Sequence, residues 1–324
     1  MTRFLKAALC AIIVAVPAGA QAFEPQNPEC IAPAAPGGGW DFICRTTAKL
    51  MRELNLVPGT MQVTNMTGGG GGVAFAHVVG KRNDDANLII AASNGTTTRL
   101  AQDAFSGATE DDVRWLATFG AEYGVVAVAA DSEFNDLPSL IAKMKENPRS
   151  VSFAGGSAVG GYDHLKILKL AKVAGLPDVR QVKYVAFSGG GEAMTQILGG
   201  SVTAFSGDFS EVRGFVEAGD MKILAVLAPE RLAGFPDFPT AKEQGLDVTG
   251  ANWRGLYVPK EMPQDAFDFW GNAIEKMVAS PEFQKIRADA GIEPLDNFGA
   301  DADAYVHDNV AEIRALSKEI GIIK

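Results

Sequence analysis

The chain has 324 residues, of which 47% are hydrophobic and 21% are charged, and it holds 36 glycines but only 3 cysteines. This composition excludes a disordered chain, a collagen and a disulfide-dense miniprotein, and the length is sufficient for two globular lobes. A formal net charge of −10 would repel phosphate backbones and anionic lipids. We therefore expect neither a nucleic-acid partner nor binding to a membrane surface.

The first 22 residues have the pattern of a secretion signal. Arg3 and Lys6 precede an apolar run over residues 7–18, and residues 20–22 (Ala-Gln-Ala) have the small-x-small pattern of a signal-peptidase site. The apolar run is shorter than the about 20 residues that a membrane-spanning helix needs, which argues against an uncleaved anchor. We predict that residues 1–22 are removed and that the mature chain is exported.

Two cysteines, Cys30 and Cys44, remain after removal of the signal. In an oxidising compartment such a pair favours a disulfide over two free thiols. A metal site would need more ligands than these two, so we expect no bound metal. A bridge between them would tie the start of the first predicted strand to the helix that follows it.

Short apolar, β-rich runs alternate with helix-length amphipathic stretches along most of the chain. The predicted strands cover residues 31–35, 61–64, 88–92, 125–130, 150–153, 182–186, 202–205 and 222–227. The predicted helices lie near residues 40–54, 72–80, 137–147, 162–174, 190–199, 210–218, 263–278, 280–290 and from 301 onward. This alternation predicts an α/β protein with mostly parallel sheets.

The mature chain would be near the upper size limit for a single core. Residues 113–130 predict a long extended passage from one lobe to another, and a return is expected near 227–236. We predict two α/β lobes joined by a two-stranded hinge. Lobe 1 is expected to hold residues 23–124 plus 229–324, and lobe 2 residues 125–228.

Four turns rich in glycine, serine or threonine follow predicted strands and open helices, at residues 36–41, 93–97, 155–161 and 188–191. Each places free backbone N–H groups at a helix N-terminus, which binds anions without a lysine or arginine. In an open α/β sheet such turns collect at the carboxyl ends of the strands, where ligands bind. One glycine pair is more often only a tight turn. Four similar turns at the same topological position predict an anion-binding site.

Nucleotide and catalytic functions are not supported by the motifs. No turn has the Gly-Lys-Ser/Thr ending of a P-loop, and a loose dinucleotide pattern at residues 69–74 lies inside a five-glycine run, so we expect no cofactor. None of the 3 histidines has metalloprotease spacing, and His164 is expected to be a cap-region or surface residue. Residues 155–159 nearly match a nucleophile elbow, but Val159 replaces its second glycine. The alternative function is an exported serine hydrolase that uses Ser157.

Charged and aromatic residues border the four turns. Asp41 and Asp163 fall in first helical turns, where a carboxylate complements the helix dipole, so we expect structural roles for both. Asp208, after the strand at 202–205, is equally compatible with a structural role and with a contact to a ligand. Arg254, on an expected turn flanked by glycine, could pair with a distal carboxylate of a ligand. The bordering aromatic residues are Trp40, Tyr162, Phe187 and Trp253.

Residues 30–41 (Cys-Ile-Ala-Pro-Ala-Ala-Pro-Gly-Gly-Gly-Trp-Asp) resemble the first strand and turn of the substrate receptors of tripartite tricarboxylate transporters, the Bug-type periplasmic receptors. Residues 184–193 and 198–202 resemble a second block of that family, and the resemblance covers essentially the whole mature chain. It implies a type II periplasmic-binding fold whose two lobes close on a small carboxylate, with no catalytic step. It also implies delivery of the ligand to the membrane subunits of a sodium- or proton-coupled transporter.

In that family, backbone N–H groups and waters hold the ligand carboxylate between turns of the two lobes. The ligand contacts implied by the resemblance are Gly38, Gly39, Trp40, Ser93 and Asn94 in lobe 1, and Gly156, Ser157, Ser188 and Gly189 in lobe 2, with Asp208 as a candidate selectivity residue. The Cys30 and Cys44 pair resembles the tricarboxylate-receptor branch. We therefore expect a monomeric periplasmic receptor for a di- or tricarboxylate such as citrate, without a cofactor.

Overall fold

The computed structural model describes residues 23–187 and 189–324. The predicted signal peptide, residues 1–22, and the predicted ligand contact Ser188 lie outside the described residues, so both stay predictions. Among the helices in the described ranges, none combines the length and the apolar character that a membrane crossing requires.

One sheet of ten strands runs through the molecule in the order β2-β1-β3-β9-β4-β7-β5-β6, with β8 and β10 also paired to β4. The strands are β1 (Glu29–Ala32), β2 (Gln62–Asn65), β3 (Leu88–Ser93), β4 (Val113–Ala129), β5 (Ser152–Gly155), β6 (Lys183–Ala186), β7 (Ala204–Asp208), β8 (Met221–Val226), β9 (Ala251–Pro259) and β10 (Ile292–Phe298). The helices are α1 (Gly39–Glu53), α2 (Gly72–Lys81), α3 (Asn94–Ala101), α4 (Leu137–Glu146), α5 (Tyr162–Val173), α6 (Gly190–Leu198), α7 (Phe209–Glu217), α8 (Gln264–Val278), α9 (Pro281–Asp289) and α10 (Ala300–Glu319).

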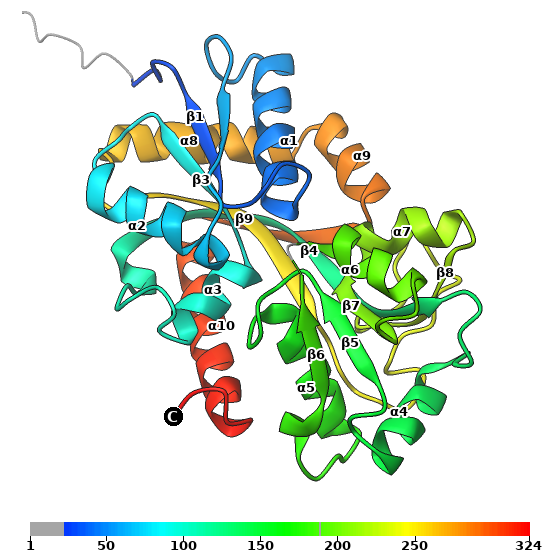
Figure 1. Ribbon diagram of the computed structural model, residues 1–324. Coiled ribbons are helices and arrows are strands. Elements are labelled where there is room, and N and C mark those ends of the chain that lie inside the picture. The colour runs from blue at the N-terminus through cyan, green and yellow to red at the C-terminus, as the bar shows by residue number, and fades with distance from the viewer. Residues whose placement is uncertain (1–22, 188) are drawn as a thin grey trace, which may run out of the picture.

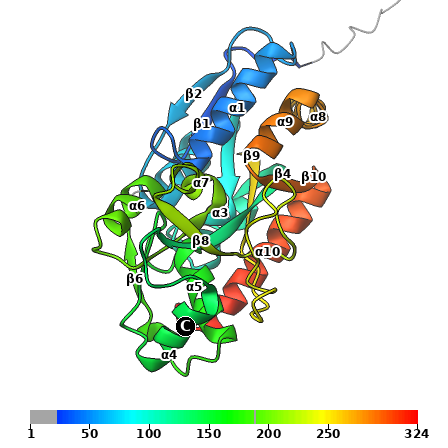
Figure 2. The ribbon, with the colours of Figure 1, turned by 90° about the vertical axis from the view of Figure 1, so that its right-hand side faces the viewer.

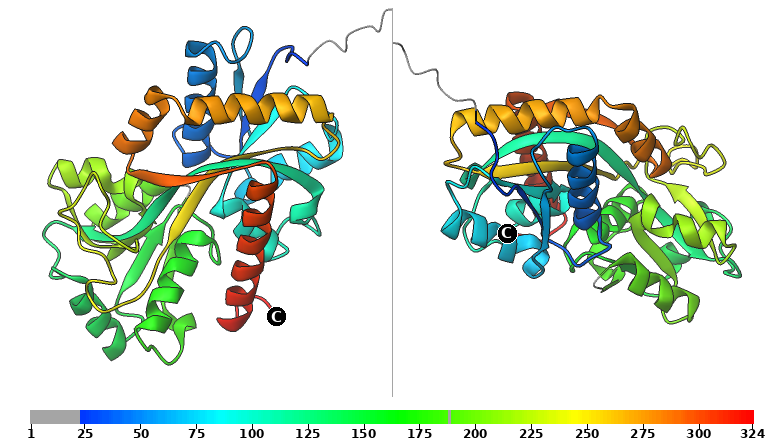
Figure 3. Two further views of the ribbon diagram at one scale, coloured as in Figure 1. Left: turned by 180° about the vertical axis from the view of Figure 1, so that it is seen from behind. Right: turned by 90° about the horizontal axis from the view of Figure 1, so that it is seen from above.

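The elements gather into two parts, which we name from the view in Figure 1. The upper half holds β1–β3 with α1, α2, α3, α8 and α9, and the lower half holds β5–β8 with α4–α7. Figure 2 shows the strands of the upper half spread side by side, from β2 toward β9 and β4, and Figure 3 shows α10 running from the middle of the molecule down beside the lower half. The alternation of strands and helices confirms the predicted α/β class.

Each half contains a parallel group of strands, and antiparallel strands join the two groups. β1 pairs in parallel with β2 and β3, and β5 pairs in parallel with β6 and β7. β4 pairs antiparallel with β7, β8, β9 and β10. The prediction of mostly parallel sheets was therefore wrong for the middle of the molecule, where the chain crosses between the halves and returns beside itself.

β4 is the strand that crosses between the halves. Its residues Val113–Tyr123 pair with β9, and its residues Gly124–Val128 pair with β7. This confirms the extended passage predicted at 113–130. The strand that runs back beside β4 is β9, and not the predicted segment 227–236. The chain after β8 first turns back, so that the backbone of Pro239 and Ala241 hydrogen-bonds to Val226 of β8. The predicted lobe boundaries themselves stay a prediction.

Two strands and one helix were not predicted. β9 is buried along almost its whole length, on both faces, so it lacks the alternation of polar and apolar residues that marks a half-exposed strand. β10 contains a proline and three acidic or amide side chains, which disfavour a strand assignment. The third missed element, α3, contains three consecutive threonines, which are weak helix formers.

Apolar faces of the helices fix where the helix N-termini lie. α1 and α8 pack on one face of the upper sheet through residues such as Ile43, Leu50, Trp270 and Ile274, all at most 2% exposed. Burying one such side chain stabilises the fold by about 1.5–3 kcal/mol. α6 and α7 pack in the same way on the lower sheet. These contacts hold the helix N-termini near the carboxyl ends of the strands that precede them.

Candidate functional site

The turn between β1 and α1 presents open backbone donors. The N–H of Gly38, the N-cap of α1, donates to the backbone oxygen of Ala35 at 3.1 Å. Within the described residues, the N–H groups of Gly39 and Trp40, the first two of α1, have no hydrogen-bond partner. The partial positive charge of a helix N-terminus adds to these two donors. Gly39 and Trp40, but not Gly38, therefore offer N–H groups to an anion.

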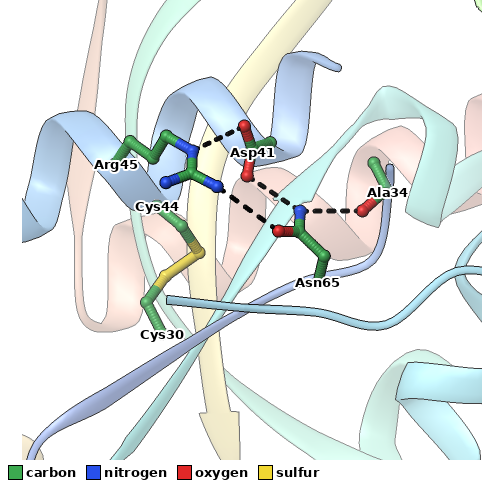
Figure 4. The surroundings of a disulfide bond; sticks show 6 residues. All are labelled: Cys30, Ala34, Asp41, Cys44, Arg45 and Asn65. Carbon is green, nitrogen blue, oxygen red and sulfur yellow. Dashed lines mark hydrogen bonds and ion pairs between the residues drawn. A yellow bond between two sulfur atoms is a disulfide. The ribbon is translucent and has the colours of Figure 1, made fainter. Parts of the chain in front are cut away.

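The Asp41 carboxylate holds this turn in shape, as Figure 4 shows. Its Oδ2 accepts hydrogen bonds from the Gly37 N–H and from Arg45 Nε, both at 2.8 Å, and its Oδ1 accepts from Asn65 Nδ2 at 2.8 Å. Asn65 Nδ2 also donates to the Ala34 oxygen at 2.9 Å. Burial alone would raise the pKa of Asp41, but the hydrogen bonds from Arg45, Gly37 and Asn65 lower it. The expected structural role of Asp41 is consistent with this geometry.

A disulfide links Cys30 of β1 to Cys44 of α1, on either side of the same turn, and the two Cα atoms are 5.6 Å apart (Figure 4). The predicted bridge is confirmed, and it joins the predicted elements. The covalent loop encloses the whole segment between β1 and the open amides of α1. Gly37 within it has φ +84°, a conformation that favours glycine. The donor turn is therefore held by a covalent link and by four polar contacts.

The turn into α3 lies against the first turn. Ser93 is the N-cap of α3, and its Oγ accepts from the Gly95 N–H at 3.1 Å and from Trp40 Nε1 at 3.0 Å. Asn94 is buried, and its Oδ1 accepts from Thr97 Oγ1 at 3.4 Å. The structure thus brings Trp40, Ser93 and Asn94 together, as the sequence predicted.

The turns of the lower half are more fully capped than those of the upper half. The Ser157 N–H donates to Asp163 Oδ2 at 3.0 Å, and Ser157 Oγ accepts from the Asp163 N–H at 2.8 Å. A β-carbon added to Gly156 would lie 3.0 Å from the Gly189 Cα, so the turns after β5 and β6 touch. Gly156, Ser157 and Gly189 are neighbours, but the polar groups of Ser157 are already paired within the chain.

The serine hydrolase alternative lacks a catalytic base. Ser157 Oγ lies 3.4 Å from the Tyr184 hydroxyl, and its hydrogen-bond donor is the Asp163 N–H. His164 Nδ1 accepts from the Gly160 N–H at 3.0 Å, which places His164 in the cap region of α5, as predicted. Burial lowers the pKa of His164 to about 4. Nothing in this arrangement activates Ser157 as a nucleophile.

A glutamate missed by the sequence analysis caps α6. Glu211 Oε1 accepts from the Gly190 N–H at 3.2 Å, and its Oε2 accepts from the Asp208 N–H at 2.9 Å. Burial of the carboxyl group, with the nearby charges of Asp208 and Asp163, raises the pKa of Glu211 to about 8. The carboxyl group of Glu211 therefore pairs with one amide at the α6 N-terminus, that of Gly190.

Asp208 is buried and fully engaged by the chain itself. Its Oδ1 lies 3.4 Å from Lys166 Nζ, and its Oδ2 accepts from Arg254 Nη2 at 2.9 Å and from Asn252 Nδ2. Burial would raise the pKa of Asp208, but the charges of Lys166 and Arg254 lower it. Of the two roles that the sequence left open for Asp208, this geometry supports the structural one, and a contact with the ligand stays a prediction.

Arg254 lies beside the open amides of α1. It is part of β9, so the expectation of a glycine-flanked turn was wrong. Its Nη2 pairs with Glu122 and Asp208, and its Nη1 lies 3.0 Å from where a β-carbon of Gly39 would stand. Arg254 is 7% exposed. A buried cation therefore adjoins the donor turn, whereas the neighbouring Trp253 faces the opposite core against Trp115 and does not border the site.

Among residues 23–187 and 189–324, no cluster of histidine, cysteine or acidic side chains is suited to hold a metal ion. The open amides of Gly39 and Trp40 have a buried arginine beside them, in a molecule whose two α/β halves are joined by β4 and β9. A helix N-terminus and a guanidinium together suit a carboxylate group. These features suit a protein that binds a small organic acid.

Known proteins agree with this class. Residues 43–322 match the model of the tripartite tricarboxylate transporter family receptor. The match covers most of the chain, so the chain belongs to this receptor family. The predicted family and fold are confirmed, and so is the expectation that the protein is a receptor and not an enzyme.

Three solved structures share the fold. The periplasmic binding protein BugD is 24% identical, with a TM-score of 0.78 over 92% of this chain and 98% of that chain. MatC from Rhodopseudomonas palustris with bound malate is 20% identical, with a TM-score of 0.77 over 90% and 98%. An R. palustris protein with adipate is 19% identical, with a TM-score of 0.80 over 91% and 97%. At these identities the likeness establishes the fold alone.

Proposed function

We propose that the protein captures a small di- or tricarboxylate between its two halves and delivers it to the membrane subunits of a tripartite tricarboxylate transporter. The observation that carries the proposal is the pair of open N–H groups on Gly39 and Trp40 beside the buried Arg254 guanidinium. Two structures with this fold hold carboxylates, one with bound malate and one with adipate. The citrate-like size of the ligand follows only from the resemblance of the first turn to the family.

The energetics are compatible with this proposal. Hydrogen bonds to a charged group contribute about 1.5–3 kcal/mol each, and micromolar binding corresponds to about −8 kcal/mol. Two amides, the Arg254 guanidinium and a few bonds from the facing half are therefore sufficient, after the cost of ordering the ligand is subtracted. The protein needs no metal or cofactor to reach such an affinity.

A panel of carboxylates tests the proposal on the mature chain, residues 23–324. We expect at least one of citrate, malate, succinate, adipate and benzoate to raise the melting temperature and to give a saturable calorimetric isotherm. A ligand present at 100 times its Kd stabilises the folded state by about 2.7 kcal/mol. Absence of any shift and any binding heat across the panel would overturn the proposed function.

A glycine substitution tests the location of the site. Gly39→Ala puts a methyl group 3.0 Å from Arg254 Nη1, next to the open amides, so we expect at least about a 10-fold weaker carboxylate affinity. Gly271→Ala on α8 is the matched control, since a β-carbon there meets nothing within 4 Å. It should leave the affinity unchanged. Equal affinities of the two variants would place the site elsewhere.

The proposal includes export to the periplasm, action as a monomer and removal of residues 1–22. Expression in a Gram-negative host should give a periplasmic protein whose intact mass corresponds to a chain that begins at Phe23. A product that keeps residues 1–22 would contradict the proposed processing.

A further inference from the structure

Two buried polar atoms near the site have no hydrogen-bond partner in the described part of the chain. They are the hydroxyl group of Tyr162 and the side-chain oxygen Oδ1 of Asn252. Tyr162 is 8% exposed and Asn252 is 7% exposed. Buried polar atoms are rarely left unpaired, because the loss of their hydrogen bonds to water is unfavourable. A partner from outside the chain would remove this penalty.

Asn252 adjoins the proposed carboxylate site through Arg254. The two residues are two positions apart on β9, so their side chains point to the same face of the sheet. Asn252 Nδ2 and Arg254 Nη2 both donate to Asp208 Oδ2. Arg254 Nη1 lies against the Gly39 position at the start of α1. The Arg254 side chain therefore connects the neighbourhood of the unpaired Asn252 oxygen with the open amides of α1.

Tyr162, the first residue of α5, reaches the same cluster from the lower half. The Lys166 ammonium lies 4.6 Å from the centre of its ring. Burial raises the pKa of Tyr162, and the charges of Asp208 and Asp163 raise it further. The hydroxyl group therefore keeps its proton at neutral pH and carries a hydrogen that needs an acceptor.

The two atoms differ in hydrogen-bonding character, and this difference restricts the chemical group that could bond to both. Asn252 Oδ1 only accepts hydrogen bonds, whereas the Tyr162 O–H is a donor in need of an acceptor. An alcohol hydroxyl group both donates and accepts. An ammonium group only donates, a carboxylate only accepts, and a methylene group does neither.

We propose that Tyr162 and Asn252 recognise an alcohol hydroxyl group on the bound organic acid, so that the receptor prefers hydroxycarboxylates to the same acids without the hydroxyl. This inference rests on the proposed function, since Gly39, Trp40 and Arg254 hold the carboxylate of the same ligand. A ligand that lacks the hydroxyl leaves both buried atoms unpaired, and sites of this kind discriminate strongly against such analogues.

Matched ligand pairs test the proposal on the wild-type mature chain. Malate and succinate differ by one hydroxyl group, as do citrate and tricarballylate. For the better-bound pair, calorimetry should give at least about a 10-fold lower Kd for the hydroxy acid. Aspartate, which has an ammonium group in place of the malate hydroxyl, should bind more weakly than malate.

The variant Tyr162→Phe tests the assignment of the residue. It should weaken binding of the hydroxy acid and leave binding of its analogue unchanged, so that the preference falls by about 10-fold. Tyr257→Phe is the control, because Tyr257 is 1% exposed and packs in the core of the upper half against Trp115 and Phe75. It should keep the wild-type preference. Far-UV circular dichroism confirms that both variants are folded.

Three outcomes would overturn this inference alone: equal affinities within the pairs, tighter binding of aspartate than of malate, or an unchanged preference in Tyr162→Phe. The first is also the result expected if an ordered water satisfies both atoms. Should Tyr162→Phe fail to fold, the ligand pairs on the wild-type chain still decide the question. Absence of binding by every acid would overturn the proposed function, and this inference with it.

Discussion

The donor turn of α1 and the turns of α5 and α6 look alike in sequence but differ in their hydrogen bonding. Gly39 and Trp40 keep open N–H groups, whereas the Ser157 N–H is bound by Asp163 and the Gly190 N–H by Glu211. The side chains that hold the α1 turn bind its flanks, at Ala34 and Gly37, and leave the helix end free. A glycine-rich turn therefore offers an amide to an anion only where no nearby carboxylate already pairs with that amide.

Loss of the Arg254 cation should have the largest effect. Arg254→Gln removes the guanidinium that pairs with the buried carboxylates of Glu122 and Asp208, and removing one member of a buried pair destabilises by about 3–5 kcal/mol. We expect a loss of this size in urea unfolding and a weaker carboxylate affinity.

Arg287→Gln is the matched control for Arg254→Gln. Arg287 of α9 is 5% exposed and pairs with Asp296 of β10 at 2.7 Å. The variant Arg287→Gln should be less stable than the wild type, but its folded fraction should bind the ligand with wild-type affinity. If both variants lose affinity equally, the role of Arg254 is structural only.

Loss of the disulfide should have the next largest effect. Cys30 and Cys44 are 14 residues apart, and a bridge closing a loop of this size stabilises by about 3 kcal/mol. The double variant Cys30→Ala, Cys44→Ala should unfold at a lower temperature and should bind carboxylates more weakly, because the donor turn is less ordered. A reducing agent should lower the melting temperature of the wild type and not that of the double variant. An unchanged affinity would show that Asp41 and Asn65 order the turn without the bridge.

A smaller effect is expected from Asp41→Asn, which weakens the hydrogen bonds to Gly37 and Arg45. We expect a loss of about 1–2 kcal/mol in urea unfolding, together with a weaker affinity. The pKa of Asp41 is lowered in the folded state, so its contribution is present above the ordinary carboxyl pKa and is lost as the pH falls through the folded pKa. The stability difference between wild type and variant should therefore shrink in acid.

Asp136→Ala separates stability from binding in that experiment. Asp136 is the N-cap of α4 and accepts from the Ser139 N–H at 2.8 Å. α4 leads into β5, which lies far from β1 in the order of the sheet. Loss of this cap should reduce stability and leave ligand affinity unchanged. An equal fall in affinity in both variants would mean that the Asp41 effect comes from stability and not from the turn.

The sequence predicted the elements whose patterns are local. Apart from α3, the strand and helix positions up to residue 227, the disulfide and the turn at 36–41 follow from periodicity, cysteine count and turn composition. β9 was not predicted because it is buried on both faces. The position of Arg254, which lies on β9, was therefore not predicted either. The cap of α6 also escaped prediction, because Glu211 reaches α6 from a separate helix, and no local pattern reports such a contact.

The central claim is that the α1 amides hold a ligand carboxylate. A crystal structure of the mature chain with the acid that binds most tightly in the calorimetric panel tests this claim most directly. We expect a carboxylate oxygen within about 3 Å of the Gly39 and Trp40 nitrogens, with Arg254 Nη1 beside it. A carboxylate held only by residues of the lower half, with the α1 amides facing solvent, would contradict the account.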